Sequence, residues 1–207
     1  MTHHAKAQGF TLIELMIALA FVAFILIFAT TAVIQVMQTY NKGVAVKQIN
    51  QAGRTTLEDM VRFIRMADPV VVNTSAIANN RVCLGGVSYV WNLYNTPPAS
   101  TNLYDDGSPI TLTRVNDAAN AMCKISGSSY LPVPKAQATD VLLSNVWVMA
   151  LSVSQPSVTS PLVSITVRLA VANDPAISSG QCGVGGTVGQ FCATSDFTTT
   201  VMSGGGN

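Results

Sequence analysis

The sequence predicts an α+β fold in which one long amino-terminal helix packs against an antiparallel β-sheet. Two observations lead to this prediction. No proline occurs between Met1 and Asp68, and the apolar residues after Lys42 recur at helical spacing. After Pro69 the pattern changes to short β-branched runs separated by Gly, Pro, Asn and Asp clusters, which is typical of strands and loops.

The composition narrows the class of protein. The chain has 207 residues, 10% of them charged, and a formal net charge of +1. This length suits one globular domain beside a membrane segment. An average soluble protein has about 25% charged residues, so the polar surface here must come largely from Ser, Thr, Asn and Gln. No basic block is present that would hold a polyanion, and a nucleic-acid partner is therefore not expected.

The first part of the expected helix is an apolar run with one carboxylate, Glu14. No side chain from Leu15 to Asn41 is charged. A helix of that length covers roughly 40 Å, which exceeds the hydrocarbon core of about 30 Å. No Ala-x-Ala cleavage site follows before Lys42, so we expect a retained single-pass membrane span. Lys6 favours a cytoplasmic amino terminus, with the rest of the chain outside the cytoplasm.

The segment from Gly9 to Glu14 (GFTLIE) resembles the class III signal of type IV pilins and type II secretion pseudopilins. The resemblance implies that prepilin peptidase cuts between Gly9 and Phe10 and that the new amino terminus of Phe10 is N-methylated. It also implies a pilin-like fold and a role for Glu14 in assembly. Many major pilins carry a proline where this chain has Thr31. Because threonine keeps its backbone N–H, we expect no proline-linked helix break here.

A carboxylate inside a bilayer costs on the order of a few kcal/mol unless it is paired or lies near the interface. Glu14 lies one helical turn from Phe10, whose amine would be cationic after cleavage. Pairing within one chain and pairing with a neighbouring chain are both open from the residues alone. The resemblance favours the neighbour's amine, which would set the axial register between subunits.

Four parts are expected along the chain: a cleaved leader at 1–9, a transmembrane and assembly helix at 10–41, an amphipathic helix extension at 42–68 and a β-rich domain at 69–207. The helix should run from about Thr11 to Ala67. One face of its second half holds residues spaced by three or four, which predicts a stripe against the sheet: Ile49, Gly53, Leu57, Met60, Ile64 and Ala67.

Strands are expected at 70–72, 82–84, 87–93, 110–115, 141–153, 162–171 and 197–201, with loops at 96–109 and 126–134. Apolar residues fall on both faces of 141–153, which predicts a strand buried on both sides. The run at 162–171 alternates and should pair with it. The run at 197–201 should be an edge strand.

All cysteines follow the apolar run: Cys83, Cys123, Cys182 and Cys192. None forms a CxxC pair, and His3 and His4 lie in the expected leader, so a zinc site lacks ligands. Two disulfides in an oxidising compartment are expected. Three connectivities are open, and our hypothesis is Cys83–Cys123 with Cys182–Cys192.

No phosphate-binding loop or nucleophile elbow is present, and no histidine follows the expected leader. We therefore expect no enzyme activity, metal, cofactor or small-molecule substrate. Asp105 to Ser108 (DDGS) should form a type I turn in preference to a calcium loop. The Trp and Tyr residues are expected to serve core and edge packing.

The resemblance implies a structural subunit that packs through its helix into a filament. Residues 57–67 and 190–200 also resemble minor pilins that initiate type IV pilus assembly, which favours a minor pilin at the initiating or capping end. Its partners would be other major and minor pilins, prepilin peptidase and the inner-membrane assembly platform. It would reside in the inner membrane before reaching the pilus and cell surface. A type II secretion pseudopilin and a filament-tip adhesin or DNA-capture module remain alternatives.

Overall fold

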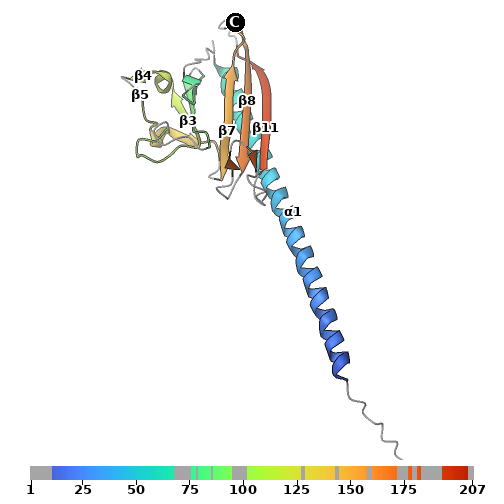
Figure 1. Ribbon diagram of the computed structural model, residues 1–207. Helices are drawn as coiled ribbons and strands as arrows, with labels where there is room; N and C mark the ends of the chain where they lie inside the picture. The colour runs from blue at the N-terminus through green and yellow to red at the C-terminus, as the bar shows by residue number, and fades with distance from the viewer. Residues whose placement is uncertain are drawn as a thin grey trace, which may run out of the picture. The chain divides into compact units, whose positions relative to one another are not determined.

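The computed structural model describes residues 11–67, 76–77, 79–84, 86–94, 102–126, 129–142, 145–157, 160–171, 177–178, 181–182 and 193–204. The chain divides into two compact units, with the boundary between Asn41 and Lys42. A long amino-terminal helix and antiparallel sheets make up the described chain (Figure 1), so the predicted α+β class is confirmed.

Helix α1 runs from Leu12 to Met66, within one residue of the predicted limits. It passes without a break through Thr30 and Thr31, because no proline removes a backbone N–H there. Their hydroxyls donate to carbonyls of the preceding turn, at 2.9 Å to Leu26 O and 2.8 Å to Phe28 O. Two β-branched residues are therefore accommodated without an unsatisfied hydroxyl.

In the second unit, α1 buries one stripe of residues at spacings of three and four: Ala45, Ile49, Gly53, Thr56, Met60 and Ile64. The predicted stripe is right except at its middle, where Thr56 is fully buried and Leu57 is only half-buried. The Phe197 ring packs against Gly53 near this point, and the buried stripe continues through Thr56. Ala67, just beyond the helix, is also buried.

One antiparallel sheet of four strands has the order β1-β2-β3-β6. Its strands are β1 Arg81–Cys83, β2 Gly86–Trp91, β3 Leu112–Asp117 and β6 Ala138–Asp140. The first three correspond to predicted strands. The fourth was missed because it is only three residues long and two of them, Ala138 and Asp140, are of types depleted in strands.

A second antiparallel sheet has the order β11-β8-β7, and Figure 1 shows β8 between its two neighbours. Its strands are β7 Val146–Ser154, β8 Leu162–Val171 and β11 Ala193–Met202. The prediction for 162–171 and its pairing is confirmed. The predicted edge strand at 197–201 is confirmed and begins earlier, at Ala193, because it pairs along the whole of β8.

Two short hairpins complete the described strands: β4 Ile125–Ser126 with β5 Ser129–Tyr130, and β9 Ile177–Ser178 with β10 Gln181–Cys182. The loop predicted for 126–134 is therefore wrong in part. The Ser and Gly residues of this segment predicted a loop. The structure instead pairs two residues of β4 with two residues of β5 in a short hairpin. The predicted run at 70–72 lies outside the described residues.

The prediction that 141–153 is one strand buried on both faces is wrong. Strand β7 begins at Val146 and carries a β-bulge between Val148 and Ala150. Before the bulge Val146 and Val148 are buried, and after it Leu151 and Val153 are buried. The extra residue changes the parity of the strand, so both alternating sets contain core residues although one face alone is buried.

The four-stranded sheet separates two apolar clusters, since successive residues of a strand point to opposite faces. The first core joins α1 to both sheets and includes Val82, Tyr89, Trp91 and Leu169. The second core lies on the other face and collects nine buried residues: Ala76, Cys83, Val90, Tyr104, Ile110, Val115, Met122, Cys123 and Val133.

Candidate functional site

The first turn of α1 is capped by the residues of the GFTLIE segment itself. The backbone N–H of Glu14 donates to Thr11 Oγ1 at 3.3 Å, and the Thr11 hydroxyl donates to Glu14 Oε2 at 3.4 Å. A carboxylate in the first turn also interacts favourably with the helix dipole. The spacing Thr-x-x-Glu is a known start signal for helices, and it could have predicted this arrangement. Gly9 and Phe10 lie outside the described residues.

On both sides of Glu14, the first unit of α1 presents large apolar side chains that are exposed. All of the following are more than half exposed: Leu12, Ile13, Leu15, Met16, Ile17, Leu19, Phe21, Val22, Phe24, Ile25, Leu26, Ile27, Phe28, Val33, Ile34, Val36, Met37 and Tyr40. Among the described residues, α1 is the one helix long and apolar enough to cross a membrane. Such a surface needs lipid or apolar protein around it.

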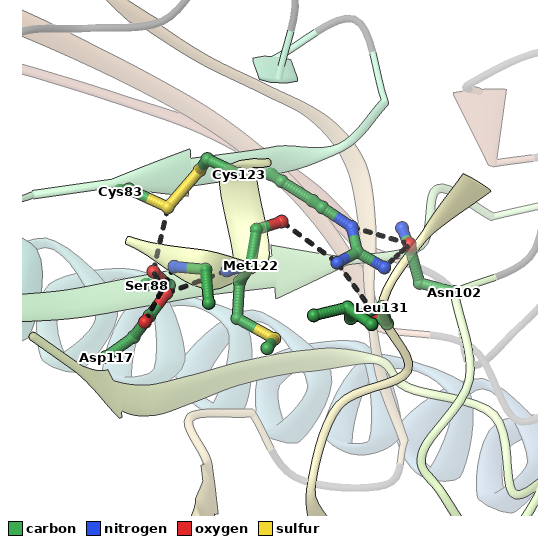
Figure 2. Close-up of a disulfide and its surroundings, with 9 residues drawn as sticks. Cys83, Ser88, Asn102, Asp117, Met122, Cys123 and Leu131 are labelled. Atoms are coloured by element: carbon green, nitrogen blue, oxygen red, sulfur yellow. Dashed lines mark hydrogen bonds between the residues drawn. A yellow bond between two sulfur atoms is a disulfide. The ribbon is translucent and has the colours of Figure 1, made fainter. Parts of the chain in front are cut away.

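The sulfur atoms of Cys83 and Cys123 form a disulfide, with Cα atoms 6.2 Å apart. It joins the end of β1 to the end of the 3₁₀ helix η2, Ala121–Cys123, as Figure 2 shows. The pair is the one in our hypothesis among three connectivities. The proposed Cys182–Cys192 bridge falls outside the described residues, because Cys192 is not among them.

Arg81 is a buried cation in β1, with 3% of its surface exposed. Its Nη1 donates to Met122 O and Leu131 O, both at 3.0 Å. Its Nε and Nη2 donate to Asn102 Oδ1 at 3.1 and 2.8 Å. Burial lowers the pKa of Arg81 to about 10, so the group stays charged at neutral pH. Sequence reasoning missed this residue, since one Arg in a short strand carries no distinguishing pattern.

Asp117, at the end of β3, holds the other end of η2. Its carboxylate accepts the backbone N–H groups of Ala121 at 2.8 Å and Met122 at 2.9 Å. The Ser88 hydroxyl donates to Asp117 Oδ2 at 2.7 Å, and its oxygen lies 2.8 Å from Cys83 Sγ. The disulfide and this carboxylate therefore lie in one connected polar group (Figure 2).

Asp59 links the second half of α1 to the sheet. The Tyr89 hydroxyl donates to Asp59 Oδ2 at 2.8 Å, and Arg114 forms an ion pair with Asp59 Oδ1. Burial, and then the hydrogen bond to Asp59, raises the pKa of Tyr89. Helical spacing alone does not mark Asp59 as an interior partner, because the Arg114 that reaches it comes from β3, far along the chain.

The DDGS segment forms a turn, in which Gly107 N donates to Tyr104 O at 3.0 Å and Gly107 has a φ of 80°. The Lys135 ammonium donates to Asp106 Oδ2 at 2.6 Å, and this contact lowers the pKa of Asp106 well below its usual range. The Asp106 carboxylate, which could serve as a ligand in a calcium loop, is therefore paired with the Lys135 cation. Within the described residues, no group of three or more His, Cys, Asp or Glu could hold a metal ion.

The predicted packing role of the aromatic residues is confirmed for those in the domain core. Trp91 and Tyr89 are fully buried in the first core, and Tyr104 is buried in the second. Trp147 and Tyr94 stack edge to face, with ring centroids 5.8 Å apart.

Comparison with known protein families finds a match at the amino-terminal part of the chain. Residues 4–30 match the prokaryotic N-terminal methylation motif. No curated protein and no solved structure is similar enough to match the chain. The matched segment contains the capped first turn and the first part of the exposed apolar helix. The chain thus carries the amino-terminal signal of type IV pilin-like and pseudopilin precursors, followed by an α+β domain.

Proposed function

We propose that this protein is a minor pilin-like structural subunit of a type IV pilus, which helps to initiate or cap filament assembly. One observation carries the proposal: the methylation motif at residues 4–30 coincides with the first unit of α1, which presents exposed apolar side chains and contains one carboxylate, Glu14. Lipid covers this surface before assembly, and the helices of other pilins cover it afterwards.

Processing prepares the helix for assembly. Prepilin peptidase cuts between Gly9 and Phe10, and the new amine of Phe10 is methylated. The Glu14 carboxylate then neutralises the Phe10 amine of a neighbouring subunit. An unpaired carboxylate in a low-dielectric surrounding is costly, so this pairing selects one axial register. The Thr11 hydroxyl keeps the carboxylate at the start of the helix.

Mass spectrometry of the protein purified from membranes and filaments tests the processing step. The expected mature chain begins at Phe10 and carries one methyl group on its amine. A Gly9→Val variant should keep its leader, because a branched side chain would replace hydrogen at the scissile bond. A native protein that retains residues 1–9 without a methyl group on Phe10 would contradict the proposal.

Substitution of Glu14 tests the assembly step. Glu14→Ala and Glu14→Leu should remain in the membrane and be depleted about tenfold or more in sheared filaments, since the neighbour's amine loses its partner. Gln35→Ala is a matched control, because it changes a polar side chain of the same helix away from the motif. Incorporation of both Glu14 variants at the wild-type level would rule out the charge pairing.

A pseudopilin of a type II secretion system is the second candidate, because the same motif serves both kinds of filament. The two differ in the phenotype of a deletion strain. Loss of pili and twitching motility with normal protein secretion supports the minor pilin. Loss of secreted proteins with normal pili supports the pseudopilin.

A further inference from the structure

Arg81 and Cys83 make two separate links between the same pair of segments. They lie two residues apart in β1, so their side chains share one face of the sheet. Arg81 Nη1 donates to Met122 O, and Cys83 is bonded to Cys123, the next residue of η2. One link is covalent and the other is a charged hydrogen bond, and they attach to adjacent residues.

The guanidinium also fixes what surrounds η2. It donates to Leu131 O and Asn102 Oδ1, and it lies 4.8 Å from the centroid of the Tyr130 ring. These acceptors are neutral, and the cation is almost completely buried. Removing one partner of a buried charge leaves the charge poorly compensated. The guanidinium of Arg81 therefore holds the segments of Asn102, Met122 and Leu131 against β1.

We propose that Arg81 is a positioning residue for the Cys83–Cys123 bridge, holding η2 against β1 before the sulfur atoms are joined. Within the described residues, the hydrogen bonds of Arg81 go to oxygen atoms, so the same contacts can form in the reduced chain. Asp117 fixes the opposite end of η2 through its two N–H acceptor contacts. Together they raise the effective concentration of one thiol at the other, which favours the Cys83–Cys123 bridge.

The oxidation step requires an external oxidant, for which oxidised glutathione is suitable. One cysteine thiolate attacks its sulfur–sulfur bond and forms a mixed disulfide, releasing one glutathione thiolate. The second cysteine thiolate then attacks the mixed disulfide and releases the other glutathione. Two protein thiols lose two protons and two electrons, and one glutathione disulfide becomes two reduced glutathiones. Positioning by Arg81 affects the second attack and the equilibrium of the whole exchange.

The test measures the effective concentration of Cys83 and Cys123 in glutathione redox buffers. The full chain in detergent is used, with Cys182→Ser and Cys192→Ser in the background so that one pair remains. Arg81→Met should lower the effective concentration about tenfold or more, because the guanidinium contacts to Met122, Leu131 and Asn102 are lost. Arg81→Lys keeps the charge but lacks the several N–H donors of the guanidinium. Its effective concentration should therefore lie between those of the parent and Arg81→Met.

Two controls separate positioning from general loss of stability. Asp59→Ala removes a polar contact between helix and sheet, and Arg168→Met removes an exposed ion pair with Asp196. Both should keep the effective concentration within about twofold of the parent while folded. Near-ultraviolet circular dichroism establishes that each reduced protein is folded. If Arg81→Met does not fold when reduced, Arg81→Lys decides. An effective concentration equal to the parent's in a folded Arg81 variant overturns the proposal.

Discussion

Gly53 in α1 lies directly against the ring of Phe197 in β11. A Cβ atom at residue 53 would stand 2.2 Å from Phe197 Cε2, which is closer than atoms can approach. The contact brings the helix backbone against the edge strand of the three-stranded sheet, so the absence of a side chain at 53 sets the spacing there.

Gly53→Ala is expected to destabilise the domain by about 1–2 kcal/mol, since the half-buried Phe197 ring must shift to admit the methyl group. Gly43→Ala is the matched control. No atom lies within 4 Å of its Cβ position, so the gain in helix propensity should stabilise by up to about 1 kcal/mol. Thermal unfolding of both full chains in detergent measures the difference, and equal effects would contradict the close contact.

Asp59→Ala is expected to cost about 2 kcal/mol, because the Tyr89 hydroxyl and the Arg114 guanidinium both lose their partner. Glu58→Ala changes the neighbouring, exposed carboxylate and should stay within about 0.5 kcal/mol of wild type. Urea unfolding gives both free energies. A cost for Asp59→Ala no larger than for Glu58→Ala would show that the helix–sheet contact contributes nothing.

Stability should fall at alkaline pH through Tyr104. Burial and the hydrogen bond to Asp140 raise the pKa of Tyr104 from 10.0 to about 12. Between these values the unfolded chain has lost the phenol proton and the folded chain keeps it, so the free energy of unfolding decreases as pH rises. Tyr104→Phe should be less stable than wild type at neutral pH. The difference between their free energies of unfolding should become smaller above pH 10.0. Urea unfolding across this range checks the narrowing, and a constant gap would contradict it.

Thr11→Val should lower the stability of the first turn of α1 by about 0.5–2 kcal/mol, because the Glu14 N–H loses its side-chain acceptor. Amide hydrogen exchange of residues 12–15 in micelles should become faster. Thr31→Val is the control, since its hydroxyl bonds Phe28 O inside the helix, far from the first turn. Equal exchange in wild type and Thr11→Val would mean that the cap is not formed in solution.

The sequence by itself determined the local features of this protein. Helix α1 could be predicted to within a residue because its period, its lack of proline and its apolar run are local signals. The same holds for β8, whose alternation places one set of side chains in the core. The N-terminal methylation motif is local as well, since its match at residues 4–30 is one continuous segment.

Only the tertiary structure decided what depends on residues far apart in the chain. The bulge in β7 arises from its register against β8, and no single strand carries that information. Asp59 becomes an interior partner because Arg114 lies opposite it, and Gly53 becomes a contact point because Phe197 packs there. Arg81 gains its buried contacts from three segments far along the chain, which contain Asn102, Met122 and Leu131. Each of these outcomes follows from pairwise geometry, which composition and periodicity cannot contain.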